Sequence, residues 1–137
     1  MPHDPARIED TRAWLRKAAL DLDTARILRD HGSAQLGNCV FHCQQAAEKA
    51  FKAFLAWHDE PFRKTHNLEE LGRQVAALDP TFLALIDRAA TMTEYAWQFR
   101  YPGEPEWPTP EEAEDALATA REVYEAVLAR LPEEARP

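Results

Sequence analysis

Apolar residues recur every three or four positions along most of the chain, which is the spacing of one face of an α-helix. Five stretches carry this pattern, with proline, glycine or helix-capping residues near their ends. They cover residues 9–30, 34–58, 68–78, 80–99 and 110–131. No stretch alternates apolar and polar residues as a half-buried strand does. The sequence therefore predicts an all-α fold, an up-and-down helical bundle of four to five helices, in a single domain over residues 1–137.

Two of the predicted helices have clear start signals. Thr109 precedes Pro110, and Glu112 stands three residues after Thr109, which is the spacing of a capping box. Asn67 and Glu70 have the same spacing at the start of the third stretch. Capping side chains satisfy backbone N–H groups that the first turn of a helix leaves without partners. Both helices are therefore expected to begin at these residues.

The most apolar helical segment, residues 41–57, also carries a line of polar side chains. Each residue turns an α-helix by about 100°, so four polar residues fall on one side of the helix and form this line. They are His42, Gln45, Lys49 and Lys52. The opposite side is predicted to face the core, through Leu36, Val40, Cys43, Ala47, Ala50, Phe51 and Phe54. Two lysines with an imidazole and an amide could line a shallow site for an anion or a nucleotide. The same pattern is typical of a solvated outer face, and spacing leaves both interpretations open.

A short basic loop precedes the third helix, with Arg63, Lys64, Thr65 and His66 in a row. Helix N-termini attract anions through unpaired N–H groups and the helix dipole. The loop is therefore a second candidate for an anion site. The alternative role is local structure, in which His66 ties down the loop and Thr65 competes for the helix cap.

Four prolines in nine residues exclude a continuous helix before the last stretch, at Pro102, Pro105, Pro108 and Pro110. Tyr101 and Trp107 give this loop aromatic side chains to bury, so we expect an ordered loop rather than a linker. The chain has four tryptophans, at positions 14, 57, 97 and 107. This is more than a small core needs, and some of them are candidates for anchoring an interface.

The formal net charge of −8 is concentrated near the end of the chain. Residues 104–137 hold ten acids and three bases, whereas residues 1–103 hold 14 acids and 13 bases. Because affinity for duplex nucleic acid follows phosphate neutralisation by lysine and arginine, broad duplex DNA binding is not expected. A local basic site for a nucleotide or an RNA end is compatible with this balance.

No run of about 18 apolar residues is present, and the first residues carry no apolar stretch of the signal-peptide type. We therefore expect a cytoplasmic protein with no membrane contact. Cys39 and Cys43 lie four apart on one predicted helix, poorly placed for an unstrained disulfide, and are expected to be small buried thiols. No second Cys or His pair supports a metal site, and no glycine-rich phosphate loop is present, so no metal or other cofactor is expected.

Three ordered motifs resemble those of the HEPN family (higher eukaryotes and prokaryotes nucleotide-binding domain). They are FHCQQAAEKAFKAFL at residues 41–55, KTHNLEEL at residues 64–71 and FRYP at residues 99–102. The resemblance covers about residues 9 to 131 and is closest to the small stand-alone prokaryotic type. It implies a compact bundle that is often dimeric, and often encoded or fused with a minimal nucleotidyltransferase. Many members of the family behave as toxins or RNases, and others are nucleotide-binding or interaction modules.

The chain departs from the RNase branch of that family at one position. That branch carries an arginine, four to six residues and then a histidine near the start of the last long helix. Arg100 takes the place of the arginine, but Pro105, Glu106 and Trp107 follow where the histidine would stand. An enzyme is therefore less expected than a binding module. A metal-independent RNase toxin that combines Arg100 with His66 or with His42 is the alternative, and a structural homodimer is a second one.

The leading hypothesis is a nucleotide-binding or partner-binding module that acts with a small nucleotidyltransferase in a toxin–antitoxin-like pair, as a homodimer. In this hypothesis lysine and arginine side chains neutralise phosphate, while the histidines exchange hydrogen bonds with the ligand. The candidate nucleotide- or anion-binding residues are His42, Gln45, Lys49, Lys52, Lys64, His66, Arg100 and Tyr101.

Overall fold

The computed structural model describes residues 3–102 and 107–137, and within them the fold is all-α. Its five α-helices are α1 (Pro5–His31), α2 (Leu36–Trp57), α3 (Leu68–Leu78), α4 (Leu83–Ala90) and α5 (Pro110–Ala129). Short 3-10 helices are η1 (Ser33–Gln35), η2 (Pro80–Phe82), η3 (Thr93–Ala96) and η4 (Glu133–Ala135). The predicted all-α bundle of four to five helices is confirmed. Among the helices of the described residues, none combines the length and apolar character that crossing a membrane requires.

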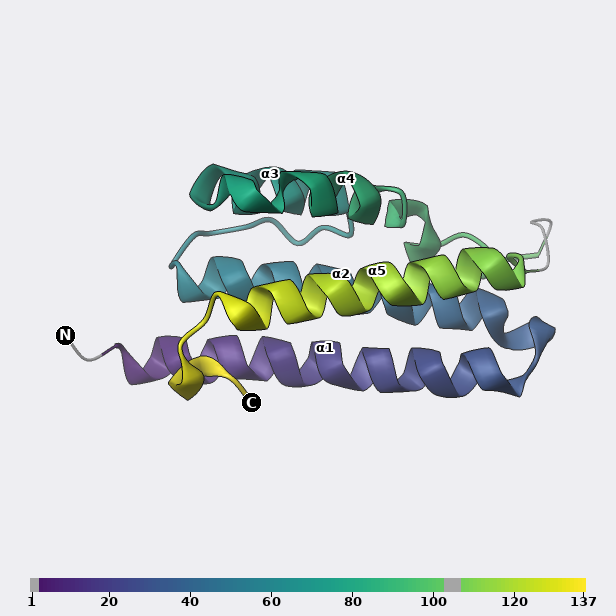
Figure 1. Cartoon of the computed structure of the whole chain (residues 1–137), viewed down its shortest axis with the longest axis horizontal. Helices are drawn as coiled ribbons and strands as arrows, with labels where there is room; N and C mark the ends of the chain where they lie inside the picture. Colours follow the sequence, from purple (N-terminus) through teal and green to yellow (C-terminus); the bar gives the residue numbers. More distant parts are fainter. Residues whose placement is uncertain (1–2, 103–106) are drawn as a thin grey trace.

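The three long helices lie side by side, and the α3–α4 hairpin packs against α2 and α5 on the side away from α1 (Figure 1). α1 and α2 are antiparallel, whereas α5 runs in the same direction as α2. After α2 the chain returns along the bundle without helical structure, over residues 58–67, before α3 begins. We call this stretch the crossover segment. It places irregular backbone and several polar side chains directly beside α2.

The hydrophobic core is centred on α2, which packs against α1, α3 and α5. Phe82 of η2 joins two aromatic rings of α2, since its ring centre lies 6.5 Å from that of Phe51 and 5.2 Å from that of Phe54. Every residue of α2 that helical spacing predicts to face the core is buried. The other fully buried large side chains include Leu15, Leu55, Leu68, Leu71, Val75, Met92 and Leu117.

The helix starts follow the predicted capping residues, one fully and one in part. At α5 the Thr109 hydroxyl accepts from the Glu112 N–H, and the Glu112 carboxylate accepts from the Thr109 N–H, which is a complete capping box. At α3 the Asn67 side chain accepts from the Glu70 N–H. The Glu70 carboxylate accepts from Arg63 instead of returning to the cap. Local competition for that carboxylate explains the difference.

The fourth predicted helix, residues 80–99, is interrupted in the structure. α4 ends at Ala90, and the Thr91 hydroxyl donates to the Arg88 carbonyl at its C-terminus. The chain continues through η3 to Phe99, whose φ of 68° is in the left-handed region. The Phe99 side chain lies against Gly37 of α2, where a Cβ would come within 2.9 Å of the Phe99 Cβ. The predicted helix is therefore divided into α4 and η3, and its end is set by the close approach of Phe99 to the start of α2.

The expectation that the proline-rich loop buries its aromatic residues is wrong for the part that is described. Tyr101 is 65% exposed and Trp107 is 43% exposed. Pro105 and Glu106 lie outside the described residues. The core is already filled by α2, η2 and α5, so it offers these rings no place.

The α3–α4 contact makes a testable prediction at Gly72. A Cβ on this residue would lie 2.4 Å from Cγ2 of Ile86, so Gly72→Ala overpacks the contact and should cost about 1–3 kcal/mol of unfolding free energy. Adding Ile86→Ala should recover part of that loss in denaturant titrations. Arg73→Ala, on the exposed side of the same turn, should stay within about 0.5 kcal/mol of wild type. A Gly72→Ala protein as stable as wild type would contradict the packing described here.

Candidate functional site

α2 is covered on most of its circumference and leaves one line of side chains partly open to solvent. Asn38 is exposed, and Phe41, His42, Gln45 and Lys49 are partly buried along the same side of the helix. The structure thus places three of the candidate residues on one line. We call this side, from Asn38 to Lys49, the α2 line.

Asp21 of α1 holds two side chains of the α2 line. Its carboxylate oxygens lie 2.8 Å from His42 Nδ1 and 2.6 Å from Lys49 Nζ, and the residue is only 8% exposed. A buried carboxylate needs such partners because it has lost its water. The charge of Lys49 is therefore compensated within the protein.

Glu48 is the centre of a second, deeper network, and its residue is 3% exposed. Oε1 lies 2.7 Å from His66 Nδ1, and Oε2 accepts from Lys52 Nζ at 2.9 Å. Gln44 donates to the same Oε1 at 3.2 Å and to the His66 carbonyl at 2.9 Å. The carboxylate and the Gln44 amide together fasten the end of the crossover segment to α2.

The prediction that Lys52 belongs to the solvated polar line is wrong. Lys52 is 6% exposed, and its Nζ lies 5.5 Å from the ring centre of Trp14 and 5.7 Å from that of Phe62. Phe62 belongs to the crossover segment, which covers this turn of α2. Lys52 is therefore a buried charge that is paired with Glu48 and lies over two aromatic rings.

His66 presents one nitrogen to the protein and the other to solvent. Its side chain is 62% exposed, although Nδ1 is bound to the buried Glu48. An ionised carboxylate only accepts hydrogen bonds, so a neutral His66 carries its proton on Nδ1 and leaves Nε2 as an outward acceptor. Lys64 is exposed two residues earlier and makes no ion pair with the described residues.

Arg100 reaches the α2 line from the corner that follows η3. Its guanidinium carbon lies 4.0 Å from the ring centre of Phe41, and Nη1 donates to the Ala96 carbonyl at 3.4 Å. Phe41 also meets the His42 ring edge-on, with ring centres 5.1 Å apart. Arg100 and His42 therefore contact the same aromatic ring. Tyr101 is exposed beside Arg100.

A family model for the HEPN domain matches residues 11–131 of the sequence. The chain belongs to the HEPN family. The crystal structure of an archaeal HEPN homologue has a TM-score of 0.72 and 23% sequence identity, covering 88% of this chain and 96% of the archaeal chain. At this identity the likeness shows the shared fold. No curated protein matches the sequence.

In this HEPN domain the residues that organise the site are ones that helical periodicity did not single out. Asp21 and Glu48 were not candidates, yet they hold His42, Lys49, Lys52 and His66. One signal was present for Glu48, which stands four residues before a lysine inside the most apolar segment. For Asp21 the signal was an acid within the otherwise apolar stripe of the first helix.

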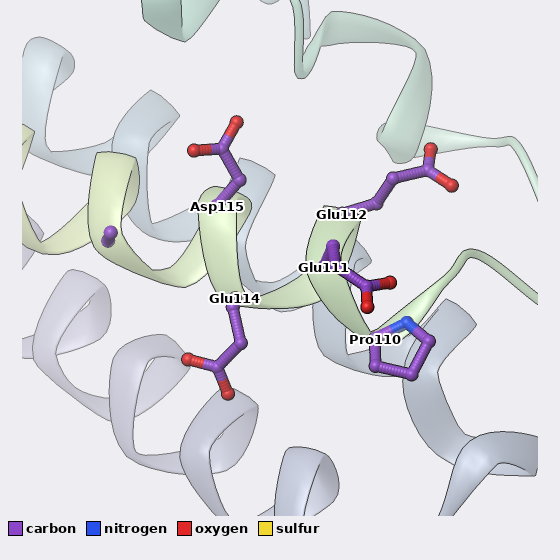
Figure 2. Close-up of a pocket in the computed structure, with 6 residues that line it drawn as sticks. Pro110, Glu111, Glu112, Glu114 and Asp115 are labelled. Carbon is purple, nitrogen blue, oxygen red and sulfur yellow. The ribbon is translucent and has the colours of Figure 1, made fainter.

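A hollow of about 770 Å³ lies away from these residues, on the first turns of α5 (Figure 2). Figure 2 shows carboxylates along its rim, at Glu111, Glu112, Glu114 and Asp115. Four carboxylates disfavour a phosphate ligand, so this hollow is not a candidate for the nucleotide. Among the described residues, no group of three His, Cys, Asp or Glu side chains is placed to hold a metal ion.

Cys39 and Cys43 are both buried, and neither forms a disulfide. A hydrogen bond with Cys39 and burial both raise the pKa of the Cys43 thiol. The same hydrogen bond lowers the pKa of the Cys39 thiol, but both side chains are fully buried. Because burial denies a reagent access, we expect neither thiol of the native protein to react with a thiol reagent at neutral pH, and both to react after unfolding in denaturant. Rapid modification of one thiol in the native state would contradict the burial of Cys39 and Cys43.

The Glu48 network makes a prediction for stability. Glu48→Ala leaves the Lys52 ammonium buried without its counter-ion and should lower the unfolding free energy by about 3–5 kcal/mol. Glu48→Ala with Lys52→Met should be more stable than Glu48→Ala alone, because no unpaired charge remains. Denaturant titration of the two single variants and the double variant measures this coupling. Additive losses in the double variant would show that the two side chains are not energetically coupled.

Proposed function

We propose that this HEPN domain binds a nucleotide, or the phosphate end of an RNA, across the α2 line and the end of the crossover segment. The observation that supports this most is His66, which Glu48 orients with its second nitrogen exposed. Such an imidazole is a positioned hydrogen-bonding group for a base, sugar or phosphate. His42 and Gln45 would add further polar contacts from α2.

Charge pairing favours Lys64 and Arg100 for the role of binding phosphate. Lys49 and Lys52 are already neutralised by carboxylates, and Arg63 is bound to Glu70. The N-terminus of α3 adds little, because the Leu68 N–H donates to Thr93 and the Glu70 N–H donates to Asn67. The proposed site therefore depends on two side-chain cations rather than on a helix terminus.

We further propose that the domain acts with a small nucleotidyltransferase protein in a toxin–antitoxin-like pair, as a cytoplasmic homodimer. The support is membership of the HEPN family together with the absence of a histidine after Arg100 in the sequence. Without that histidine, binding is a better assignment than catalysis for the chain itself. Co-expression with the protein encoded beside this chain, followed by co-purification, tests the pairing.

Isothermal titration calorimetry with ATP, GTP and their monophosphates tests the ligand. Lys64→Ala and Arg100→Ala should each weaken binding by about tenfold, because each removes a charge-assisted contact to phosphate. Lys49→Ala should change affinity less, since Asp21 already neutralises that lysine. Arg121→Ala, an exposed cation of α5, is the control and should bind like wild type. Wild-type protein that shows no binding at millimolar nucleotide would contradict the proposal.

The alternative function is a metal-independent RNase, and the Glu48–His66 pair is the observation that favours it. A carboxylate that orients an imidazole is a common arrangement of a general base, and Arg100 would stabilise charge on the phosphate. We expect no cleavage when labelled tRNA and mRNA are incubated with the protein in EDTA. Cleavage that disappears in His66→Ala and Arg100→Ala would establish the RNase instead.

A further inference from the structure

Two large aromatic side chains are exposed in the segments that follow η3 and precede α5. Figure 1 shows that the end of η3 and the start of α5 lie towards the same end of the bundle. Trp97 is 50% exposed and Trp107 is 43% exposed. The other two tryptophans differ, since Trp57 is buried and Trp14 packs against Phe62. Tryptophan is one of the residue types that most often anchor protein interfaces. The exposed pair therefore marks this end as a candidate docking surface.

The same end carries the acidic hollow on the first turns of α5. Trp107 stands three residues before Pro110, which begins the rim of carboxylates on α5 (Figure 2). A smaller hollow of about 60 Å³ is lined by Tyr95 from η3 and by Glu112 and Asp115 from α5. It joins the η3 side of the surface to the α5 side. The pKa of Tyr95 is raised by burial and by these two carboxylates, which agrees with a negative potential.

Part of this negative charge is not used inside the protein. Glu114 pairs with Arg29, and Glu112 caps its own helix. Glu111 and Asp115 make no ion pair with any residue of the described ranges. Their carboxylates project from the α5 ribbon (Figure 2). Two carboxylates thus remain to meet an incoming positive charge.

The backbone around Trp97 is held in place by packing. Tyr95 and Phe99 pack against each other with ring centres 6.2 Å apart, and Phe99 lies against Gly37 of α2. A docking residue presented by such a fixed backbone loses little conformational entropy when a partner binds.

We propose that Trp97, Trp107 and the carboxylates of Glu111 and Asp115 form a docking surface for a lysine- or arginine-rich segment of a protein partner. Charge selects this occupant. Phosphates of a nucleic acid and the headgroups of an anionic membrane are repelled by the carboxylates, and a second copy would bring like charges together. A basic segment with apolar residues matches both the charge and the exposed rings. The surface does not depend on nucleotide binding at the α2 line.

The four indole N–H signals of a ¹⁵N-labelled sample test this surface directly. The probe is a 14-residue amphipathic peptide with lysine on one helical face and leucine on the other. We expect the Trp97 and Trp107 signals to shift on titration, while Trp14 and Trp57 stay unchanged and serve as internal controls. A peptide with glutamate in place of lysine should produce no shift. Equal shifts at all four indoles, none at millimolar lysine peptide, or equal binding of both peptides would overturn the proposal.

Charge-matched variants locate the binding on this surface. Glu111→Lys with Asp115→Lys should weaken the lysine peptide by at least about tenfold, because attraction becomes repulsion. Glu125→Lys with Glu133→Lys makes the same change in net charge elsewhere and should have a smaller effect. Trp97→Ala should also cost about tenfold. If both charge variants weaken peptide binding equally, the affinity depends only on net charge and the surface is not a specific docking site. His66→Ala should leave peptide binding unchanged, which separates this test from that of the nucleotide site.

Discussion

Glu48 imposes the constraint on which much of this structure depends. A carboxylate within the most apolar helix loses its water on folding, and that loss is costly unless hydrogen bonds and a counter-charge replace it. Lys52 supplies the charge from the next turn of α2, and His66 supplies a donor from the crossover segment. The crossover segment must therefore lie along α2, with Phe62 covering Lys52. This requirement fixes where α3 begins and which side of His66 faces solvent.

Asp21 is a second buried carboxylate that needs polar partners, and it lies between α1 and α2. It ties His42 and Lys49 of the α2 line to the first helix. Lys49 and Lys52 are thus paired with carboxylates inside the bundle, whereas the proposed ligand site uses Lys64 and Arg100. In a chain with a net charge of −8, Lys64 and Arg100 are exposed cations, and Lys64 stands two residues before His66.

The fold could be predicted from the sequence because the signals for its helices are local. Helical spacing, proline and the Thr109 capping box predict five helical stretches, and four of them correspond to α1, α2, α3 and α5. The stretch at 80–99 contains α4 but is not one continuous helix, because a non-local contact decides the conformation of its end. Phe99 adopts a positive φ to pack against Gly37, and no pattern within residues 80–99 records that contact.

The candidate site could be predicted from the sequence only in part, because contacts between distant segments also decide it. A helical wheel shows which residues share a side of α2, and it placed His42, Gln45 and Lys49 together. It does not show what covers that side, so Lys52 was assigned to solvent although the crossover segment encloses it. Tyr101 and Trp107 were assigned to the interior because aromatic residues usually gain by burial, yet the core was already full.

The central claim is that Glu48 orients His66, and the tautomer of that histidine tests it most directly. Long-range ¹H–¹⁵N correlation spectra of the imidazole distinguish a proton on Nδ1 from one on Nε2. If Glu48 orients His66, neutral His66 carries its proton on Nδ1, and this preference is lost in Glu48→Ala under conditions where that variant is folded. A proton on Nε2 in the wild-type protein, or the same tautomer in wild type and Glu48→Ala, would contradict the orientation of His66 by Glu48.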